Sequence, residues 1–266
     1  MADWQRELET AQTACSIGRK ILLEYFGKLS QVEDKGEGAG LVSEADKESE
    51  RAIREYLLKE FPEYGVLGEE EGYGSRKPLS SEKGLWIIDP LDGTTNYVHQ
   101  FPVFCISIGL EVNGEIVVGV VDAPMMNQTF TAVKSQGAFL NGKKISVSKT
   151  NAFNEAFLAT GFSYKRGPNF KIQMEIFHSI YSTCRGIRRA GAAAYDLALV
   201  AAGVFDGFWE KGLKPWDLAA GSLLVREAGG MITSYDSSSF HPRQDTVIAA
   251  TPAIHPKILD EIRKHI

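Results

Sequence analysis

The chain has 266 residues, of which 44% are hydrophobic and 24% charged, and its formal net charge is −5. This length supports one large α/β unit or two packed subdomains that share a cleft, and it excludes a small disulfide-stapled fold. The acidic balance and the lack of any Lys/Arg run argue against a nucleic-acid surface, so we expect no direct nucleic-acid partner.

The first half of the chain predicts two helices followed by a series of strands. Apolar residues recur every three to four positions over residues 4–26, which predicts an amphipathic helix. A second helix is predicted over residues 43–60, where Ser43 and Asp46 have capping-box spacing. The intervening VEDKGEGAGLV is glycine-rich and charged, which is typical of a mobile loop. Short apolar runs predict strands at 64–68, 85–89, 103–112, 115–122 and 129–133, with Asn113-Gly114 as a hairpin turn.

After residue 146 the pattern changes to alternating strands and helices. Strands are predicted at 157–160, 206–210 and 231–235, and helices near 170–182 and at 192–203 and 216–228. We therefore predict an α+β subdomain over residues 1–146 and an α/β subdomain over residues 147–266, with a cleft between them.

The cysteines and the apolar runs bear on the compartment. Cys15, Cys105 and Cys184 are odd in number and lack metal-ligand spacing, as expected of reduced thiols in a cytosolic protein. The N-terminal MADWQRELETAQ lacks the apolar core of a signal peptide, and no window approaches the ~18 apolar residues that span a bilayer. We expect a cytoplasmic protein without membrane contact.

Acidic residues stand at the ends of several predicted elements, where side chains can converge on a cleft while the elements stay rigid. These residues are Asp46, Glu69, Glu70, Asp89, Asp92 and Asp217. Taken singly, Asp46 and Asp217 fit acids at helix starts, and Glu69 to Glu71 fit a solvated turn.

The segment LWIIDPLDGTTN, residues 85–96, is harder to explain by structure alone. A buried strand needs no carboxylate at its end, and Asp89 and Asp92 repel unless a cation or hydrogen-bond donors compensate them. The two carboxylates and the carbonyl of Leu91 form an all-oxygen set that suits Mg²⁺.

The residues that follow this strand add a phosphate site. Gly93 and Thr94 can present backbone N–H groups to a phosphate beside the cation. Glu69 and Asp217 would complete a multi-metal cluster of the kind that hydrolyses phosphate esters.

Together these motifs resemble the signatures of a known enzyme family. GEE (68–70), WIIDPLDGTTNYVHQFP (86–102) and WDLAAGSLLVREAGG (216–230) are similar to those of the inositol monophosphatase family, within the lithium-sensitive, Mg²⁺-dependent sugar phosphatases. The likeness extends over nearly the whole chain and includes GAFLNG (137–142) and GIRRAGAAA (186–194). It implies a layered αβαβα sandwich, usually a homodimer.

The resemblance also implies a role for each matched position. Two to three Mg²⁺ ions per active site would be bound by Glu69, Asp89, the Leu91 carbonyl, Asp92 and Asp217. Glu69, with the hydroxyl of Thr94, would orient the attacking water beside Asp92. The phosphate would lie on Gly93 and Thr94, and the leaving group would face Asp92, Gly191, Ala192, Ala193 and Glu210. Support would come from Lys35, Asp46 and Glu70.

One loop departs from the family pattern. Relatives usually carry an aspartate two residues before the valine of a D-x-V-T-x-x-D motif, whereas this chain has Gly40 there and Ser43 in place of threonine, with Asp46 retained. This change bears on the stiffness of the loop and on the weakest metal site, and it leaves the reaction unaffected.

The expected function is a Mg²⁺-dependent phosphomonoesterase acting on myo-inositol monophosphate, a small-molecule phosphate ester. Fructose-1,6-bisphosphatase or dual activity is the alternative within the same chemistry, with Arg188 and Arg189 as a possible second phosphate site. Histidinol phosphate and phosphoadenosine phosphate fit less well, because those relatives tend to depart from D-G-T-T-N. An alternative of another class is a binding protein on the same fold, a partner of RNA polymerase or of the ribosome-maturation machinery.

Overall fold

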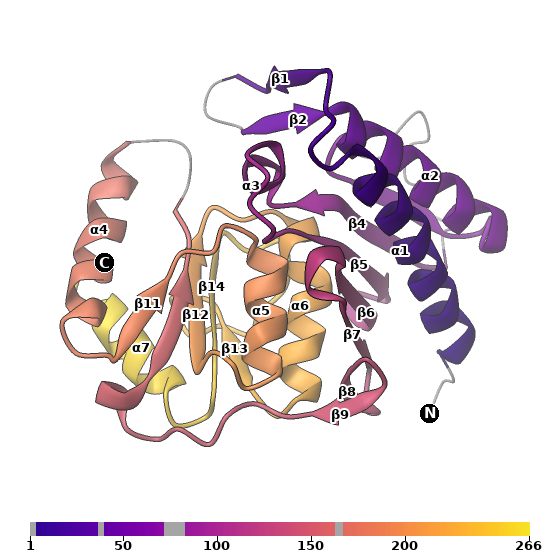
Figure 1. Cartoon of the computed structure of the whole chain (residues 1–266). Helices are drawn as coiled ribbons and strands as arrows, with labels where there is room; N and C mark the ends of the chain where they lie inside the picture. The colour runs from indigo at the N-terminus through magenta and orange to yellow at the C-terminus, as the bar shows by residue number, and fades with distance from the viewer. Residues whose placement is uncertain (1–3, 37–39, 72–82, 163–166) are drawn as a thin grey trace.

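The fold is described from a computed structural model that covers residues 4–36, 40–71, 83–162 and 167–266. Its helices and strands form five layers in the order helix, sheet, helix, sheet, helix (Figure 1). The predicted αβαβα sandwich is therefore confirmed. In the described part of the chain, no helix has both the length and the apolar run that a membrane crossing needs.

The first two layers come from the first half of the chain, much as the sequence predicts. The outer layer is α1 (Gln5–Tyr25) and α2 (Glu44–Glu60). The first sheet has the order β3-β4-β5-β6-β7-β8-β9 and is antiparallel except between β3 and β4. Its strands are β3 (Gly65–Gly68), β4 (Leu85–Asp92), β5 (Cys105–Val112), β6 (Glu115–Ala123), β7 (Gln128–Val133), β8 (Gly137–Leu140) and β9 (Lys143–Ile145).

Burial of apolar side chains holds the outer helices on this sheet. Leu22 of α1, Ile53 and Leu57 of α2 and Trp86 of β4 are fully buried in one cluster. Each such aliphatic side chain contributes about 1.5–3 kcal/mol of transfer free energy. The helices thereby fix the position of β4, whose end carries two of the predicted site residues.

The segment between the two outer helices is more regular than expected. β1 (Val32–Asp34) and β2 (Leu41–Ser43) pair antiparallel, with Val32 opposite Ser43. The prediction of a mobile loop over residues 32–42 is therefore wrong at its two flanks, and residues 37–39 lie outside the described residues. The pairing uses backbone groups, which glycine-rich composition does not exclude, and Gly40 adopts a left-handed φ of 94°.

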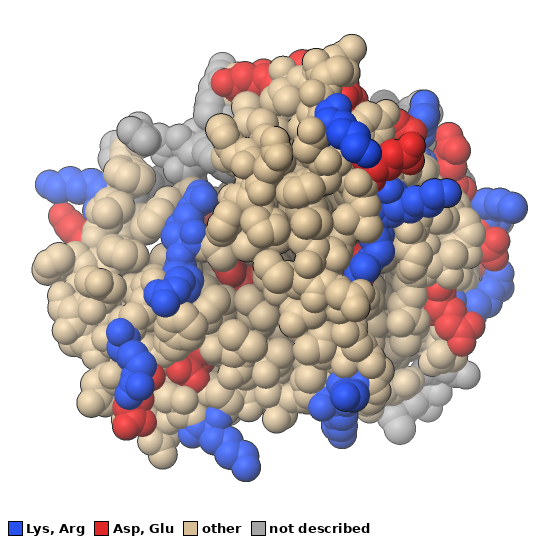
Figure 2. Space-filling view, in the orientation of Figure 1, with Lys and Arg blue, Asp and Glu red and all other residues tan. Residues whose placement is uncertain are grey.

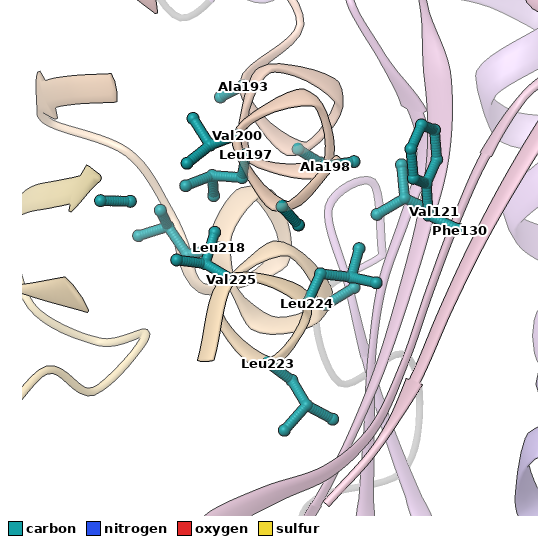
Figure 3. Packing of buried hydrophobic residues seen from close by; sticks show 14 of the residues in the cluster. Val121, Phe130, Ala193, Leu197, Ala198, Val200, Leu218, Leu223, Leu224 and Val225 are labelled. Carbon is teal, nitrogen blue, oxygen red and sulfur yellow. The ribbon is translucent and has the colours of Figure 1, made fainter. Parts of the chain in front are cut away.

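The third layer is a pair of helices between the two sheets, α5 (Ala193–Ala201) and α6 (Pro215–Glu227). Figure 3 shows Ala198 of α5 and Leu224 of α6 on the side of Val121 and Phe130, which belong to the first sheet. Gly119 of β6 lets α6 approach closely, because a Cβ there would meet the Ala220 carbonyl oxygen at 2.8 Å.

The fourth and fifth layers come from the second half of the chain. The second sheet has the order β11-β10-β12-β14-β13, and the outer helices are α4 (Pro168–Tyr181) and α7 (His255–Arg263). The strands are β10 (Phe157–Thr160), β11 (Gly186–Arg188), β12 (Gly207–Lys211), β13 (Met231–Thr233) and β14 (Thr246–Ala250). Short elements are α3 (Thr94–Val98), η1 (Pro124–Met126) and η2 (Phe153–Glu155). The proposed subdomain boundary at residue 146 falls in the connection between the sheets.

Candidate active site

A cleft of about 580 Å³ opens where elements from both halves of the chain end. It lies between the end of β4 and the β1–β2 ribbon on one side, and β10, β12 and the first turns of α5 and α6 on the other. Twelve of the residues singled out in the sequence line it: Lys35, Glu69, Asp89, Leu91, Asp92, Gly93, Thr94, Gly191, Ala192, Ala193, Glu210 and Asp217. Asp46 and Glu70 lie behind this wall, in contact with residues that form it.

Three carboxylates converge on the floor of the cleft. Oxygens of Asp89, Asp92 and Asp217 all lie within 4.8 Å of one another. Residues three apart in a regular strand face opposite sides of a sheet. Here the register shifts between Asp89 and Asp92 of β4, at the point where Pro90 removes a backbone N–H. This bulge lets both side chains reach the same cluster.

Backbone N–H groups hold each carboxylate in place. Asp89 accepts a hydrogen bond from the Leu91 N–H at 3.0 Å, and Asp217 accepts one from the Lys214 N–H at 2.7 Å. Asp92 accepts one from the Ala194 N–H at 2.7 Å, in the first turn of α5. The cluster therefore combines carboxylates of β4 and α6 with a backbone N–H of α5, and little freedom is left in the side chains.

Burial makes the cluster electrostatically costly. Burial raises the pKa of Asp89 and of Asp217 well above the usual range, and the charges of neighbouring carboxylates raise both further. Burial also raises the pKa of Asp92 to about 7, although the Ala194 N–H opposes the rise. A cation placed among these oxygens would offset both the burial and the repulsion.

Glu69 lies at the rim of the cluster beside a lysine. Its Oε1 accepts from Lys35 Nζ at 2.8 Å, and Lys35 Nζ also donates to Glu70 Oε1 at 2.6 Å. Burial lowers the pKa of Lys35, but the two glutamates outweigh it and leave the pKa raised. Glu69 is not one of the three carboxylates within 4.8 Å of one another, although its charge raises the pKa of each of them.

The turn that carries Glu69 is held by a residue that was not predicted from the sequence. Glu50 of α2 is fully buried and accepts from the N–H groups of Glu70 at 2.8 Å and Glu71 at 3.0 Å. Arg54, one helical turn further on, donates to Glu50 at 2.9 Å. The signal available in the sequence was an acid on the buried face of a predicted helix.

The hydroxyl of Thr94 is placed between two acceptors. Its Oγ1 lies 3.0 Å from Asp46 Oδ1 and 3.1 Å from the carbonyl oxygen of Leu91, and it can donate to one of them at a time. Asp46 is itself fixed, because its Oδ2 accepts from the N–H of Ser43 at 2.8 Å in the predicted capping box. When the proton points to Asp46, the Thr94 oxygen is free to accept a hydrogen bond from the cleft.

Gly93 sits where only glycine fits. Its φ is 96°, and a Cβ there would meet the Val103 carbonyl oxygen at 3.0 Å. Asn96 Nδ2 donates to that same oxygen at 2.7 Å and to the Ala190 carbonyl at 2.8 Å. One amide therefore ties the segment after β4 to the segment that leads to Gly191.

The opposite wall carries acidic and basic groups with few partners. Glu210, at the end of β12, lies against Gly161, and its carboxylate makes no hydrogen bond to any residue that the structure describes. Arg189 lines the cleft, whereas Arg188 lies over the Phe157 ring at 4.7 Å and does not line it. The two arginines therefore do not form a joint second phosphate site.

Asp196 of α5 is a cleft residue that was not predicted from the sequence. It is 2% exposed and lines the cleft from the first turns of the helix. A lone acid within the apolar AAYDLALVA was the available signal.

The sequence and the structure are similar to those of known proteins of one family. A model of the inositol monophosphatase family matches residues 3–266. The chain is 38% identical over 268 residues to a fructose-1,6-bisphosphatase/inositol-1-monophosphatase of Aquifex aeolicus, which covers 100% of this chain and 98% of the relative. It is 39% identical to Nus factor SuhB of Pseudomonas aeruginosa, with 98% and 97% covered. The solved inositol monophosphatase of Anabaena matches with a TM-score of 0.88 at 36% identity, with 100% and 98% covered.

Proposed function

The chain belongs to the inositol monophosphatase family, and we propose that it is a Mg²⁺-dependent phosphomonoesterase that converts myo-inositol monophosphate into inositol and phosphate. The observation that carries the proposal is the cluster of Asp89, Asp92 and Asp217, whose oxygens lie within 4.8 Å of one another on the floor of a cleft. Hydrolysis of phosphate esters at such clusters is a common use of paired divalent cations.

The donor set fits a hard divalent cation. All three side chains offer oxygen, the ligand atom that Mg²⁺ prefers, and their burial gives a strong reason for a positive charge to be held among them. We propose that Glu69 and the Leu91 carbonyl complete the ligands for two to three ions. When bound, Mg²⁺ would supply the positive charge that activates a water and neutralises the leaving oxygen.

Groups of the chain itself would place the water and the phosphate. Two acceptors can each take a hydrogen bond from one water: the Thr94 oxygen, with its proton donated to Asp46, and Oε2 of Glu69, to which no described residue donates. We assign the backbone N–H groups of Gly93 and Thr94 to the phosphate, because Gly93 has no Cβ to block the approach.

We assign the opposite wall to the leaving group. Gly191, Ala192 and Ala193 bring backbone close to the cleft, and Glu210 offers a carboxylate that no described residue occupies. Such a carboxylate can accept hydrogen bonds from hydroxyls of an inositol ring.

Fructose-1,6-bisphosphatase activity is the nearest alternative, because the Aquifex relative carries both activities in its name. Arg189, Lys211 and Lys214 line the cleft and could face a second phosphate. A binding role is the alternative of another class, since the Pseudomonas relative is named as a Nus factor. The intact carboxylate cluster favours catalysis as at least one role of this chain.

We also propose a homodimer. Figure 2 shows a broad central area, in the region of α3, that is largely free of Lys, Arg, Asp and Glu. Phe101, Met125 and Met126 are 51%, 40% and 39% exposed. They lie at the same end of the first sheet, because Ile106 of β5 pairs with Asp122 of β6.

The function is tested by phosphate release from four esters in excess Mg²⁺: inositol 1-phosphate, fructose 1,6-bisphosphate, histidinol phosphate and phosphoadenosine phosphate, with p-nitrophenyl phosphate as a generic ester. We expect the highest kcat/KM with inositol 1-phosphate, no turnover in EDTA, and inhibition by millimolar-range lithium. A preference for the bisphosphate would favour the alternative substrate. No turnover of any ester would overturn the proposal of a phosphatase.

A further inference from the structure

Asp196 has a buried carboxylate that accepts no hydrogen bond from any described residue. Its Oδ1 is inaccessible to solvent, and no described residue donates a hydrogen bond to it. No ion pair joins Asp196 to Arg189 or to any other cation among the described residues, even though Arg189 is close enough to lower the pKa of Asp196 against the rise caused by burial. Buried polar atoms in native proteins almost always have a hydrogen-bond partner, so this exception needs an explanation.

A structural role does not supply that explanation. Asp206, another buried aspartate of the same half, accepts from the Phe157 N–H at 2.7 Å and from the Ser148 hydroxyl, and so ties two segments together. Asp196 makes no such connection within the described chain, and nothing there fixes its carboxylate by hydrogen bonding. No hydrogen bond within the described chain therefore competes with a ligand for the carboxylate, which lines the cleft.

The surroundings indicate what kind of group would meet it. The carboxylate of Glu210 also lines the cleft without a hydrogen-bond partner in the described residues, and the charge of Asp196 helps to raise the pKa of Glu210. Two carboxylate acceptors repel a phosphate but suit a molecule with several O–H donors. Arg189, on the same wall, supplies one positive charge to the pair.

We propose that Asp196 is a specificity-determining residue that, together with Glu210, accepts hydrogen bonds from hydroxyls on the leaving group of the phosphate ester. The proposal rests on the phosphatase function proposed above and adds Asp196 to the groups that would recognise the hydroxyls of the alcohol. It assigns to Asp196 a contact that is made to the alcohol and not to the phosphate or to Mg²⁺.

The experiment compares two esters and three variants. Inositol 1-phosphate carries ring hydroxyls, whereas p-nitrophenyl phosphate has none. Asp196→Ala removes the acceptor, Asp196→Asn keeps one acceptor oxygen and the shape, and Tyr195→Phe is a matched control one residue away, whose hydroxyl donates to Gln128 at 2.7 Å outside the cleft.

We expect Asp196→Ala to lower kcat/KM for inositol 1-phosphate by roughly ten- to a hundredfold and to leave the aryl ester within about twofold. Asp196→Asn should lose less, and Tyr195→Phe should change neither ester. Deoxy analogues of inositol 1-phosphate allow a cycle in which the carboxylate and the substrate hydroxyl are removed singly and together. Removal of the contacted hydroxyl should lower kcat/KM with the wild type but should cause little further loss with Asp196→Ala.

Three results would overturn the proposal. An unchanged kcat/KM for inositol 1-phosphate in both Asp196 variants would show that the carboxylate does not contribute to substrate recognition. Turnover by the wild type would still support the phosphatase function. Equal losses with both esters, with a lower Tm, would show that Asp196 supports the fold or the cluster. If the wild type hydrolyses neither ester in excess Mg²⁺, the phosphatase function fails and the role of Asp196 fails with it.

Discussion

The carboxylate of Asp92 has two roles that a single substitution can separate. It belongs to the buried cluster, and it also accepts from the Ala194 N–H at 2.7 Å at the start of α5. An asparagine keeps one oxygen that can accept from Ala194, but it removes the negative charge that we assign to Mg²⁺.

We therefore expect Asp92→Asn to fold normally and to lose at least ~10³-fold in kcat with Mg²⁺. In EDTA the variant should melt above the wild type, because one of several crowded, buried carboxylates is gone. Steady-state kinetics measures the loss in kcat, and thermal melting in EDTA measures the gain in Tm. Near-normal turnover would refute the assignment of Asp92 to the metal.

Two roles are open to Glu210: it accepts hydrogen bonds from ring hydroxyls of the substrate, or it is an acid with a structural role only. It is 9% exposed and lines the cleft, and its carboxylate accepts no hydrogen bond from the described chain, so its substitution breaks no side-chain hydrogen bond there. Glutamine keeps one acceptor oxygen but loses the charge and the second acceptor, and losing a charged acceptor for substrate hydroxyls costs about 1–3 kcal/mol.

We expect Glu210→Gln to lower kcat/KM for inositol 1-phosphate by roughly ten- to a hundredfold and to leave p-nitrophenyl phosphate nearly unchanged. Parallel assays of the two esters measure this difference. Equal losses would instead place Glu210 in support of the cluster, and no loss with either ester would make it a structural acid.

Single residues are easier to predict from the sequence when their role depends on neighbours along the chain. They are harder to predict when their role depends on tertiary contacts. Asp89 and Asp92 stand in one segment with Gly93 and Thr94, so their pattern is readable without the fold. Glu50 acts on the N–H groups of Glu70 and Glu71, some 20 residues away, and that contact exists only after α2 has packed on β3.

At the scale of elements, β4 and α6 determine whether the cluster forms. The bulge in β4 brings Asp89 and Asp92 to one side, and Asp217 reaches them from the first turn of α6. The position of α6 depends in turn on the backbone of the first sheet, where Gly109 and Gly119 leave no room for a Cβ.

Gly119→Ala tests this dependence. Its Cβ would lie 2.8 Å from the Ala220 carbonyl oxygen and 3.1 Å from the Ala220 Cα, which are backbone atoms that cannot rotate away. We expect a loss of about 1–3 kcal/mol in the free energy of unfolding, with a lower kcat as α6 is displaced. Denaturant unfolding and kinetics measure both.

Gly186→Ala of β11 is the matched control. A Cβ there would have its nearest neighbours at 3.9 Å, so we expect a change within about 0.5 kcal/mol. Equal stability of the two variants would mean that α6 shifts without cost, contrary to the close packing described above.

Among the elements, those with a clear apolar pattern were predictable, including the short strands β3 and β10, whereas β1 and β2 were not. α1 and α2 begin and end within a residue or two of the predicted ranges, because their apolar stripes and caps are strong. β1 and β2 were missed because a three-residue ladder of backbone hydrogen bonds leaves no hydrophobic pattern to detect.

At the scale of the whole molecule, the layers follow from which faces are apolar. α5 and α6 carry apolar residues on most of their surface, since both sides are covered by a sheet, and the outer helices carry one buried face. The alternation of strands and helices after residue 146 predicted the second sheet. Its strand order could not be predicted, because pairing between β12 and β14 depends on contacts distant in sequence.

The homodimer is the prediction that belongs to this scale. Phe101, Met125 and Met126 are exposed together at one end of the first sheet, and large apolar side chains at such density are typical of a surface that a partner covers. Placing a carboxylate within a packed interface would leave a charge buried without a partner.

We expect the wild type to have twice its chain mass of 29.3 kDa in light scattering coupled to size exclusion, and Met125→Glu to run at the mass of one chain. Val204→Glu is the control, because Val204 is 52% exposed but follows the end of α5 that points away from the cleft. It should remain dimeric. A monomeric wild type would refute the homodimer, and dissociation of both variants alike would place the interface elsewhere, because a charge at Val204 would then be as disruptive as one beside Phe101.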